Sequence, residues 1–227
     1  MKSPLYCNQI AFDLFVSQLA QIETNDGLCN AVTAIAMHFD PQVSPQLVSL
    51  ELDAIANQVI SRVTSGSNRA LTAHLHQVLF SELAFRGDTE NFFDPSNSFL
   101  PNVLECKRGI PITLSLIYKL VAERCGLNVV GINAPGHFLV CLDLKKERMI
   151  IDCFSGGTLL SADEVSARIM NMTASQELAD LSVSEFATHR QWVARILANL
   201  INIFSVQNRP EDMAAASELY DVLKVAY

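Results

Sequence analysis

The sequence predicts an α+β fold, with a helical layer at the N-terminus, a core that contains a small antiparallel sheet, and a helical hairpin at the C-terminus. Three observations support this prediction. Apolar residues recur at helical spacing over 1–90, short apolar runs separated by turn residues replace that pattern in the middle of the chain, and helical spacing returns near the end. We therefore expect three regions, covering 1–90, 91–175 and 176–227.

The first two helices are expected near 8–22 and over 28–39. The second of them should end before Pro41, because the residue that precedes a proline is pushed out of the helical conformation. Both segments carry apolar residues at spacings of three and four, which is typical of a helix that buries one side.

The third and fourth helices have recognisable starting residues. Ser44 is a suitable N-cap and Pro45 suits the first helical position. This third helix should continue to Gly66, and Ser67 can cap the fourth. The buried stripe that we expect on the third helix consists of Leu47, Leu50, Ala54, Val59 and Val63.

The middle region begins after a cluster of turn-forming residues at 94–98. An apolar helix is expected over 111–125, with Gly126 in the position just past its end. Short antiparallel strands should follow, over 129–132, 137–142 and 149–154. The last part of the chain returns to helices, which we expect near 161–171, over 186–206 and over 211–225, with a break at Arg209-Pro210 between the last two.

Composition excludes several classes of protein. The chain has 227 residues with 50% hydrophobic residues, which excludes a disordered chain. Its longest apolar run, over 109–118, is about half of the roughly 20 residues that a membrane-spanning helix needs. The net charge of −8 argues against a nucleic-acid partner. We expect no signal peptide and a cytoplasmic protein.

The six cysteines suggest neither a metal nor a redox centre. They form no CxxC pair and do not cluster with histidines, so no metal site and no cofactor is predicted. In a chain of this size in the cytoplasm, most of them should be reduced thiols that pack as small hydrophobic side chains.

His137 and Asp152 are expected to meet across the hairpin of the second and third strands. A turn centred near 144–145 places them directly opposite each other, and opposed side chains lie on the same face with Cβ atoms about 5 Å apart. The carboxylate could then fix the tautomer of the imidazole. A slip of one residue in the register would instead send the two side chains to opposite faces.

Three motifs carry a resemblance to a known family: Arg108-Gly109-Ile110-Pro111, Pro135-Gly136-His137-Phe138-Leu139 and Ile151-Asp152. They resemble the transglutaminase-like superfamily, relatives of the papain-type fold, in which Gly-x-Cys at a helix start is followed by His and Asp on adjacent strands. They look most like its bacterial SirB-type branch. The resemblance covers roughly 45–225. It implies a helical N-terminal part, a papain-like core and a tail that resembles one tetratricopeptide unit.

The chain departs from the superfamily at the nucleophile. The cysteine position, two residues after Gly109, holds Pro111, as the SirB-type motif itself reads Gly-Ile-Pro. A proline cannot attack a substrate, so the Cys-His-Asp mechanism cannot operate as it does in the superfamily. Cys106 is the one other cysteine near this position, three residues before Gly109. Cys153 stands where the branch usually has proline after the aspartate.

Several functions remain open on this basis. The leading prediction is a non-catalytic or regulatory protein that holds a peptide or a small ligand in a cleft around His137 and Asp152. The second is a cysteine-dependent acyl transferase or hydrolase in which Cys106, or a bound water, attacks. The third is a scaffold whose partner docks on the terminal helices. The expected ligand contacts are Asn97, Ser98, Arg108, Gly109, Pro111, Thr113, Gly136 and Phe138.

The same residues could also have purely structural roles. His137 and Asp152 could form a buried pair that only satisfies its own polar atoms. Asn97 and Ser98 are also typical turn and N-cap residues. The sequence predicts a peptide or protein partner in general terms and does not fix the oligomeric state.

Overall fold

The computed structural model describes residues 3–64, 67–134, 136–144, 148–161, 163–165 and 186–225. The turn at 145–147, the predicted boundary between 175 and 176, and most of the helix expected near 161–171 lie outside the described residues. Within that last segment, residues 163–165 are helical.

The N-terminal region contains helices as predicted, and Ser44 and Ser67 lie at the N-cap positions expected for the third and fourth helices, whereas the second helix starts at Asn25, three residues earlier than expected. It contains α1 (Gln9–Gln18), the short η1 (Leu19–Gln21), α2 (Asn25–Phe39), α3 (Pro45–Ile60) and α4 (Asn68–His76), which continues into a π-helical turn, η2 (Gln77–Glu82). The Ser44 hydroxyl accepts a hydrogen bond from the Leu47 amide at the start of α3.

The predicted buried stripe of α3 is wrong in most of its members. Leu47 and Leu50 are 64% and 62% exposed. The helix instead ends at Ile60 and packs on α6 and its other neighbours through a different stripe, Val48, Leu52, Ile55, Ala56 and Val59. Apolar residues occur on both sides of this helix, so periodicity alone could not tell which side faces the core.

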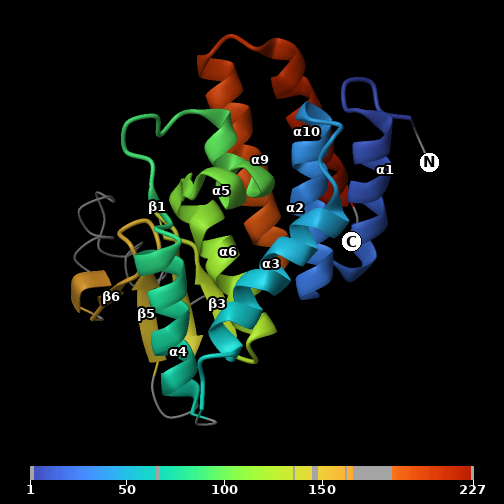
Figure 1. Ribbon diagram of the computed structural model, residues 1–227. Coiled ribbons are helices and arrows are strands. Elements are labelled where there is room, and N and C mark those ends of the chain that lie inside the picture. Colours follow the sequence, from blue (N-terminus) through green and yellow to red (C-terminus); the bar gives the residue numbers. More distant parts are fainter. Residues whose placement is uncertain are drawn as a thin grey trace.

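The core is built around α6 (Pro111–Arg124), which runs through the centre of the molecule (Figure 1). Every residue from the first through the twelfth position of this helix is buried. Its neighbour α5 (Leu100–Cys106), which was not expected from the sequence, follows a 3₁₀ turn, η3 (Pro95–Ser98). At the far end of α6, Gly126 adopts the expected left-handed conformation, with φ of +80°.

A five-stranded antiparallel sheet lies beside α6. Its strand order is β6-β5-β4-β3-β7, with β3 (Asn128–Ile132), β4 (Leu139–Asp143), β5 (Arg148–Asp152), β6 (Thr158–Leu160) and β7 (Phe186–Ala187). The three predicted strands are therefore present, and the edge strands β6 and β7 are additional. A separate parallel pair joins β1 (Arg86–Gly87) to β2 (Arg108–Gly109) directly before α6.

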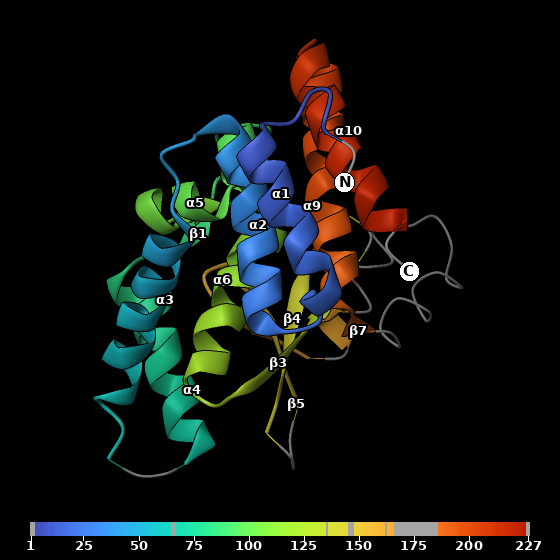
Figure 2. The same cartoon turned by 90° about the vertical axis from the view of Figure 1, so that its right-hand side faces the viewer.

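The C-terminal hairpin consists of α9 (His189–Val206) and α10 (Pro210–Val225), which lie side by side in both views (Figures 1 and 2). The first helix begins three residues later than predicted, because residues 186–187 join the sheet and Thr188 forms a capping box with Gln191. The hairpin packs on α1 and α2 and also contacts α6, so it is part of the main body of the protein.

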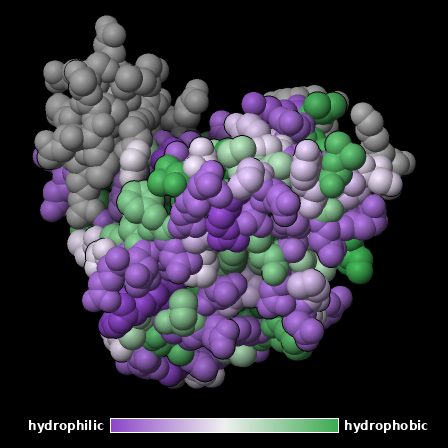
Figure 3. Space-filling model, turned by 90° about the horizontal axis from the view of Figure 1, so that it is seen from above, coloured by the Kyte–Doolittle hydropathy of each residue, from purple (hydrophilic) through white to green (hydrophobic). Residues whose placement is uncertain are grey.

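Viewed from above, the surface intersperses hydrophobic residues among hydrophilic ones (Figure 3). In the described part of the chain, no helix combines the length and the apolar character that crossing a bilayer would require. The mixed α and β architecture agrees with the predicted fold class.

Candidate functional site

The start of α6 forms one wall of the site. Ile110 is the extended residue at the N-cap, and Pro111 takes the first helical position. Directly before them, Gly109 pairs with Gly87 in the parallel strand pair. A Cβ atom on Gly109 would lie only 2.8 Å from Cγ1 of Val103, so a side chain here would push α5 away from this turn. Gly109 is therefore required for close packing at this turn.

His137 and Asp152 lie together as the sequence predicts. The Nε2 atom of His137 is 3.1 Å from Oδ1 of Asp152. The two side chains are thus in direct contact, although Nε2 lies outside the angles of a regular hydrogen bond. The Asp152 side chain is fully buried, whereas the His137 side chain is 13% exposed and can be reached from the cavity beside it.

The register that brings this pair together differs from the predicted one. Val140 pairs with Ile151 and Asp143 with Arg148, which displaces the two strands by two residues from the expected pairing. His137 thus lies before the start of β4, and Asp152 is the last residue of β5. An even displacement keeps side chains on the same face, which is why the contact survives the error.

Asp152 is held as a carboxylate by its neighbours. Its Oδ1 atom accepts hydrogen bonds from the amides of Phe154 and Ser155, and its Oδ2 atom accepts one from the Ser155 hydroxyl at 2.9 Å. Burial on its own would raise the pKa of Asp152, but the His137 side chain and Ser155 outweigh it and hold that pKa well below its usual range. Asp152 is therefore ionised and positions the imidazole.

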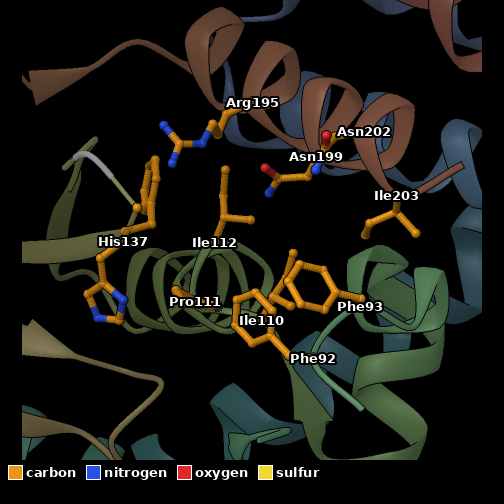
Figure 4. A pocket seen from close by; sticks show the side chains of 12 residues that line it. Phe92, Phe93, Ile110, Pro111, Ile112, His137, Arg195, Asn199, Asn202 and Ile203 are labelled. Carbon is orange, nitrogen blue, oxygen red and sulfur yellow. The ribbon is translucent and has the colours of Figure 1, made fainter. Parts of the chain in front are cut away.

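A cavity of about 170 Å³ opens beside this pair (Figure 4). Helix α6 and the loop before η3 give it apolar walls, and α9 gives it a polar wall with a guanidinium and two amides. The lining residues are Phe92, Phe93, Ile110, Pro111, Ile112, Gly136, His137, Phe138, Arg195, Asn199, Asn202 and Ile203.

Four of the predicted site residues line this cavity: Pro111, Gly136, His137 and Phe138. Phe138 is buried, and its ring lies 4.6 Å from that of Trp192 on α9. Pro111, which the resemblance places at the cysteine position of the superfamily, is therefore on the cavity wall together with the histidine.

The other expected ligand contacts do not line this cavity. Asn97 and Ser98 are buried, and the Asn97 amide donates to Asp88 and to the carbonyl of Asn91, which fixes the loop before α5. Arg108 and Gly109 belong to β2. Thr113 is fully buried in α6, and its hydroxyl has no hydrogen-bond partner within the described residues.

No cysteine lines this cavity in the described part of the protein. Cys106 is exposed at the end of α5, and its thiol donates to the carbonyl of Arg108 at 3.3 Å. The other five thiols are buried, and burial raises the pKa of Cys29 and of Cys125 to about 11. Cys153 follows Asp152 directly but is fully buried, and burial raises its pKa strongly.

Sequence reasoning missed the polar wall. Arg195, Asn199 and Asn202 are four and three residues apart on α9, so they share one face of that helix. That spacing is visible in the sequence, but no local signal indicates that this face of α9 lies beside the start of α6. Among the described residues, no group of three or more His, Cys, Asp or Glu side chains is arranged to hold a metal.

Comparison with known proteins identifies several relatives of this chain. Similar proteins include a UPF0162 protein of Xylella fastidiosa (strain 9a5c), 33% identical over 149 residues, which cover 64% of this chain and 53% of the relative. A UPF0162 protein of Pseudomonas aeruginosa is 26% identical over 200 residues, covering 87% of this chain and 72% of the relative. F-box only protein 21 of Mus musculus is 27% identical over 174 residues, covering 70% of this chain and 25% of the relative.

The chain spans about half the length of the Xylella relatives that it matches. No solved structure matches it. Residues 46–198 match the transglutaminase-like superfamily, a stretch that runs from α3 to the middle of α9 and contains both His137 and Asp152. A chain with this match, and with a histidine and an aspartate paired beside the start of a buried helix, belongs to the transglutaminase-like superfamily.

Proposed function

We propose that this protein is a non-catalytic or regulatory binding protein of the SirB-type branch, built on a transglutaminase-like core. It holds a peptide segment or a small ligand in the cavity beside His137. One observation carries the proposal: the His137–Asp152 pair adjoins a cavity whose wall has Pro111 where the superfamily has its nucleophile.

The chemistry of the cavity supports binding over catalysis. A histidine oriented by a carboxylate can accept a proton, but covalent catalysis also needs an attacking group within hydrogen-bond reach. Pro111 offers none, and Cys106 donates its thiol hydrogen to Arg108 outside the lining. A mostly apolar cavity with a few convergent polar groups is typical of a ligand site.

The proposal also concerns the cellular compartment of the protein and the class of its partner. Six free cysteines fit a reducing compartment, so we place it in the cytoplasm. We further propose that its partner is a peptide, a protein segment or a small molecule, because the net charge of −8 disfavours nucleic acid. The C-terminal hairpin, which resembles one tetratricopeptide unit, then serves the cavity through α9.

The test is a binding titration of the full chain, monitored by NMR. A panel of short acylated peptides and small aromatic compounds is added, and we expect saturable shifts at Ile112, Gly136 and Phe138. His137→Ala should weaken binding, whereas His74→Ala, on α4 and outside the cavity lining, should not.

Three outcomes would contradict the proposal. Hydrolysis or acyl transfer that depends on both His137 and Cys106 would establish the cysteine enzyme. Shifts confined to the outer faces of α9 and α10, and unchanged by His137→Ala, would favour a scaffold. Absence of any shift at the cavity across the whole panel would remove the ligand site.

A further inference from the structure

The polar wall of the cavity contains a guanidinium that has no acidic partner among the residues that the structure describes. Arg195 makes a hydrogen bond from Nη1 to Oδ1 of Asn133 at 3.0 Å, and it forms no ion pair within the described residues. A guanidinium has five N–H donors, and a neutral amide oxygen occupies only one of them. Burial lowers the pKa of Arg195, which reflects the cost of holding an uncompensated positive charge there.

The groups around this guanidinium leave room for an anion. Figure 4 shows Arg195 and Asn199 extending from α9 on the side that faces Ile112 and His137. None of the described lining residues is acidic, and the nearby carboxylate of Asp152 is engaged by His137 and Ser155. The positive charge thus stands in the cavity of a protein whose net charge is −8.

The opposite side of the cavity suits an apolar group. Phe92, Phe93 and Ile110 face the helix that carries Arg195 (Figure 4). An apolar cavity of roughly 150 Å³ is large enough for one benzene ring, so a cavity of about 170 Å³ can take one aromatic or large aliphatic side chain. A longer ligand would have to extend out of the cavity.

We infer that the cavity binds a carboxylate attached to a single apolar group, with the carboxylate on Arg195 and Asn199 and the apolar group against Phe92, Phe93 and Ile110. Two sources supply this chemistry: the C-terminal residue of a peptide, and a free small carboxylic acid. A planar guanidinium fork matches a carboxylate in two parallel hydrogen bonds, which is why arginine suits this role. The inference rests on the proposed function and names the ligand class of the same site.

The test uses the full chain and matched pairs of probes. N-acetylphenylalanine is compared with N-acetylphenylalanine amide, and a pentapeptide that ends in phenylalanine is compared with its C-terminal amide. Dissociation constants are measured by NMR titration. We expect each acid to bind at least roughly tenfold more tightly than its amide, because a charge-assisted hydrogen bond is lost in the amide.

Three variants test whether Arg195 and Asn199 cause the preference for acids over amides. Arg195→Gln should abolish the difference between acid and amide. Asn199→Asp should place a repelling carboxylate in the cavity, so that acids bind at least roughly tenfold more weakly while amides still bind. Arg62→Gln, which removes one positive charge from an exposed ion pair with Glu82, is the control and should leave the preference unchanged.

The outcomes separate this inference from the proposed function. Tighter binding of the pentapeptide acid than of the single residue would identify a peptide C-terminus, and the reverse would identify a free acid; both support the inference. Equal binding of acid and amide, a preference that persists in Arg195→Gln, or no binding of either acid would overturn it. Equal binding that is still lost in His137→Ala would leave the proposed function standing, whereas no cavity shift with any probe would remove both.

Discussion

Pro111 takes the first position of α6, where its missing N–H costs nothing because the first amides of a helix have no partner within it. His137 lies on the same cavity wall, and Asp152 holds the imidazole from behind. The orienting half of a Cys-His-Asp site is thus present around a residue that has no reactive atom. At the scale of single residues, the cavity therefore has a paired histidine and aspartate beside a helix start that offers no nucleophile.

A nucleophile introduced at this position should become reactive. In Pro111→Cys, the helix N-terminus and transfer of the thiol proton to the nearby imidazole of His137 would both favour the thiolate. We expect the new thiol to react with iodoacetamide already at about pH 6, below the pKa of about 8.5 of an ordinary cysteine. The measurement is the alkylation rate, by mass spectrometry, of the peptide that carries the substituted position.

Adding His137→Ala to Pro111→Cys should slow that alkylation at about pH 6 at least roughly tenfold. A thiol at this position that titrates as an ordinary cysteine, with or without His137, would show that the imidazole does not serve it.

Asp152 should also make stability depend on pH. Its pKa is lowered in the folded protein, so its contribution is fully present above the unfolded value of about 3.9 and is lost as pH falls through the folded value. We expect Asp152→Asn to cost about 2 kcal/mol of unfolding free energy at neutral pH, since buried hydrogen bonds to a charged group are lost. Urea denaturation at several pH values checks this.

The destabilisation by Asp152→Asn should shrink as the pH is lowered below about 4, because Asp152 of the unfolded wild-type chain takes up a proton there while the folded carboxylate is still ionised. A difference between the two proteins that stays constant down to about pH 2 would contradict the assigned ionisation of Asp152.

Elements with local signals could be predicted from the sequence. Ser44 and Pro45 start α3, and Gly126 follows the end of α6, because capping depends on a few neighbouring residues. The short helix α5 was missed because it has only seven residues and contains Pro101 in its first turn. The contact between His137 and Asp152 was predicted correctly although the strand register was not.

Features that depend on distant segments could not be predicted. The side of α3 that faces α6, and the approach of Arg195 on α9 to the start of α6, are set by how helices far apart in the sequence pack. An asparagine is typical of turns and of ligand sites alike, and only the contacts with Asp88 and Asn91 show that the Asn97 amide is hydrogen-bonded within its own loop.

The packing of the sheet against α9 makes a prediction about Gly131 on β3. A Cβ atom there would lie 2.7 Å from Cζ3 of Trp192 and 2.8 Å from Cε1 of Phe138. Both rings are buried and cannot move aside freely, so Gly131→Ala should cost about 1–3 kcal/mol of unfolding free energy. Urea denaturation measures this cost.

Gly126→Asn is the control for Gly131→Ala. Gly126 has φ of +80°, a Cβ atom added there would have no atom within 4 Å, and asparagine tolerates this conformation. We expect Gly126→Asn to be clearly less destabilising, and equal losses from the two variants would argue against overpacking at Gly131.

At the scale of the whole molecule, the N-terminal segment is hydrogen-bonded to the last helix, α10. The Glu218 carboxylate on α10 accepts hydrogen bonds from the backbone amides of Leu5, Tyr6 and Cys7. This contact holds the N-terminal segment on the hairpin whose other helix, α9, lines the cavity. The two ends of the described chain consequently lie on the same side of the protein (Figure 2).

Glu218→Gln should loosen this contact. Burial raises the pKa of the Cys7 thiol to about 12, and the Glu218 charge adds to that effect. Loss of the carboxylate should increase both amide hydrogen exchange over residues 5–7 and alkylation of Cys7, because the segment opens more often. Unchanged exchange at these amides would show that other contacts hold the segment.

The central claim is that this protein binds a ligand and has no working nucleophile. Its most direct test is alkylation by iodoacetamide from about pH 5 to about pH 9, measured for each cysteine-containing peptide of the folded wild-type protein and of His137→Ala. We predict that the five buried thiols stay unreactive, that Cys106 reacts, and that its rate is the same in both proteins. Fast alkylation of any cysteine at about pH 6 that is lost in His137→Ala would contradict the account and establish a working thiol.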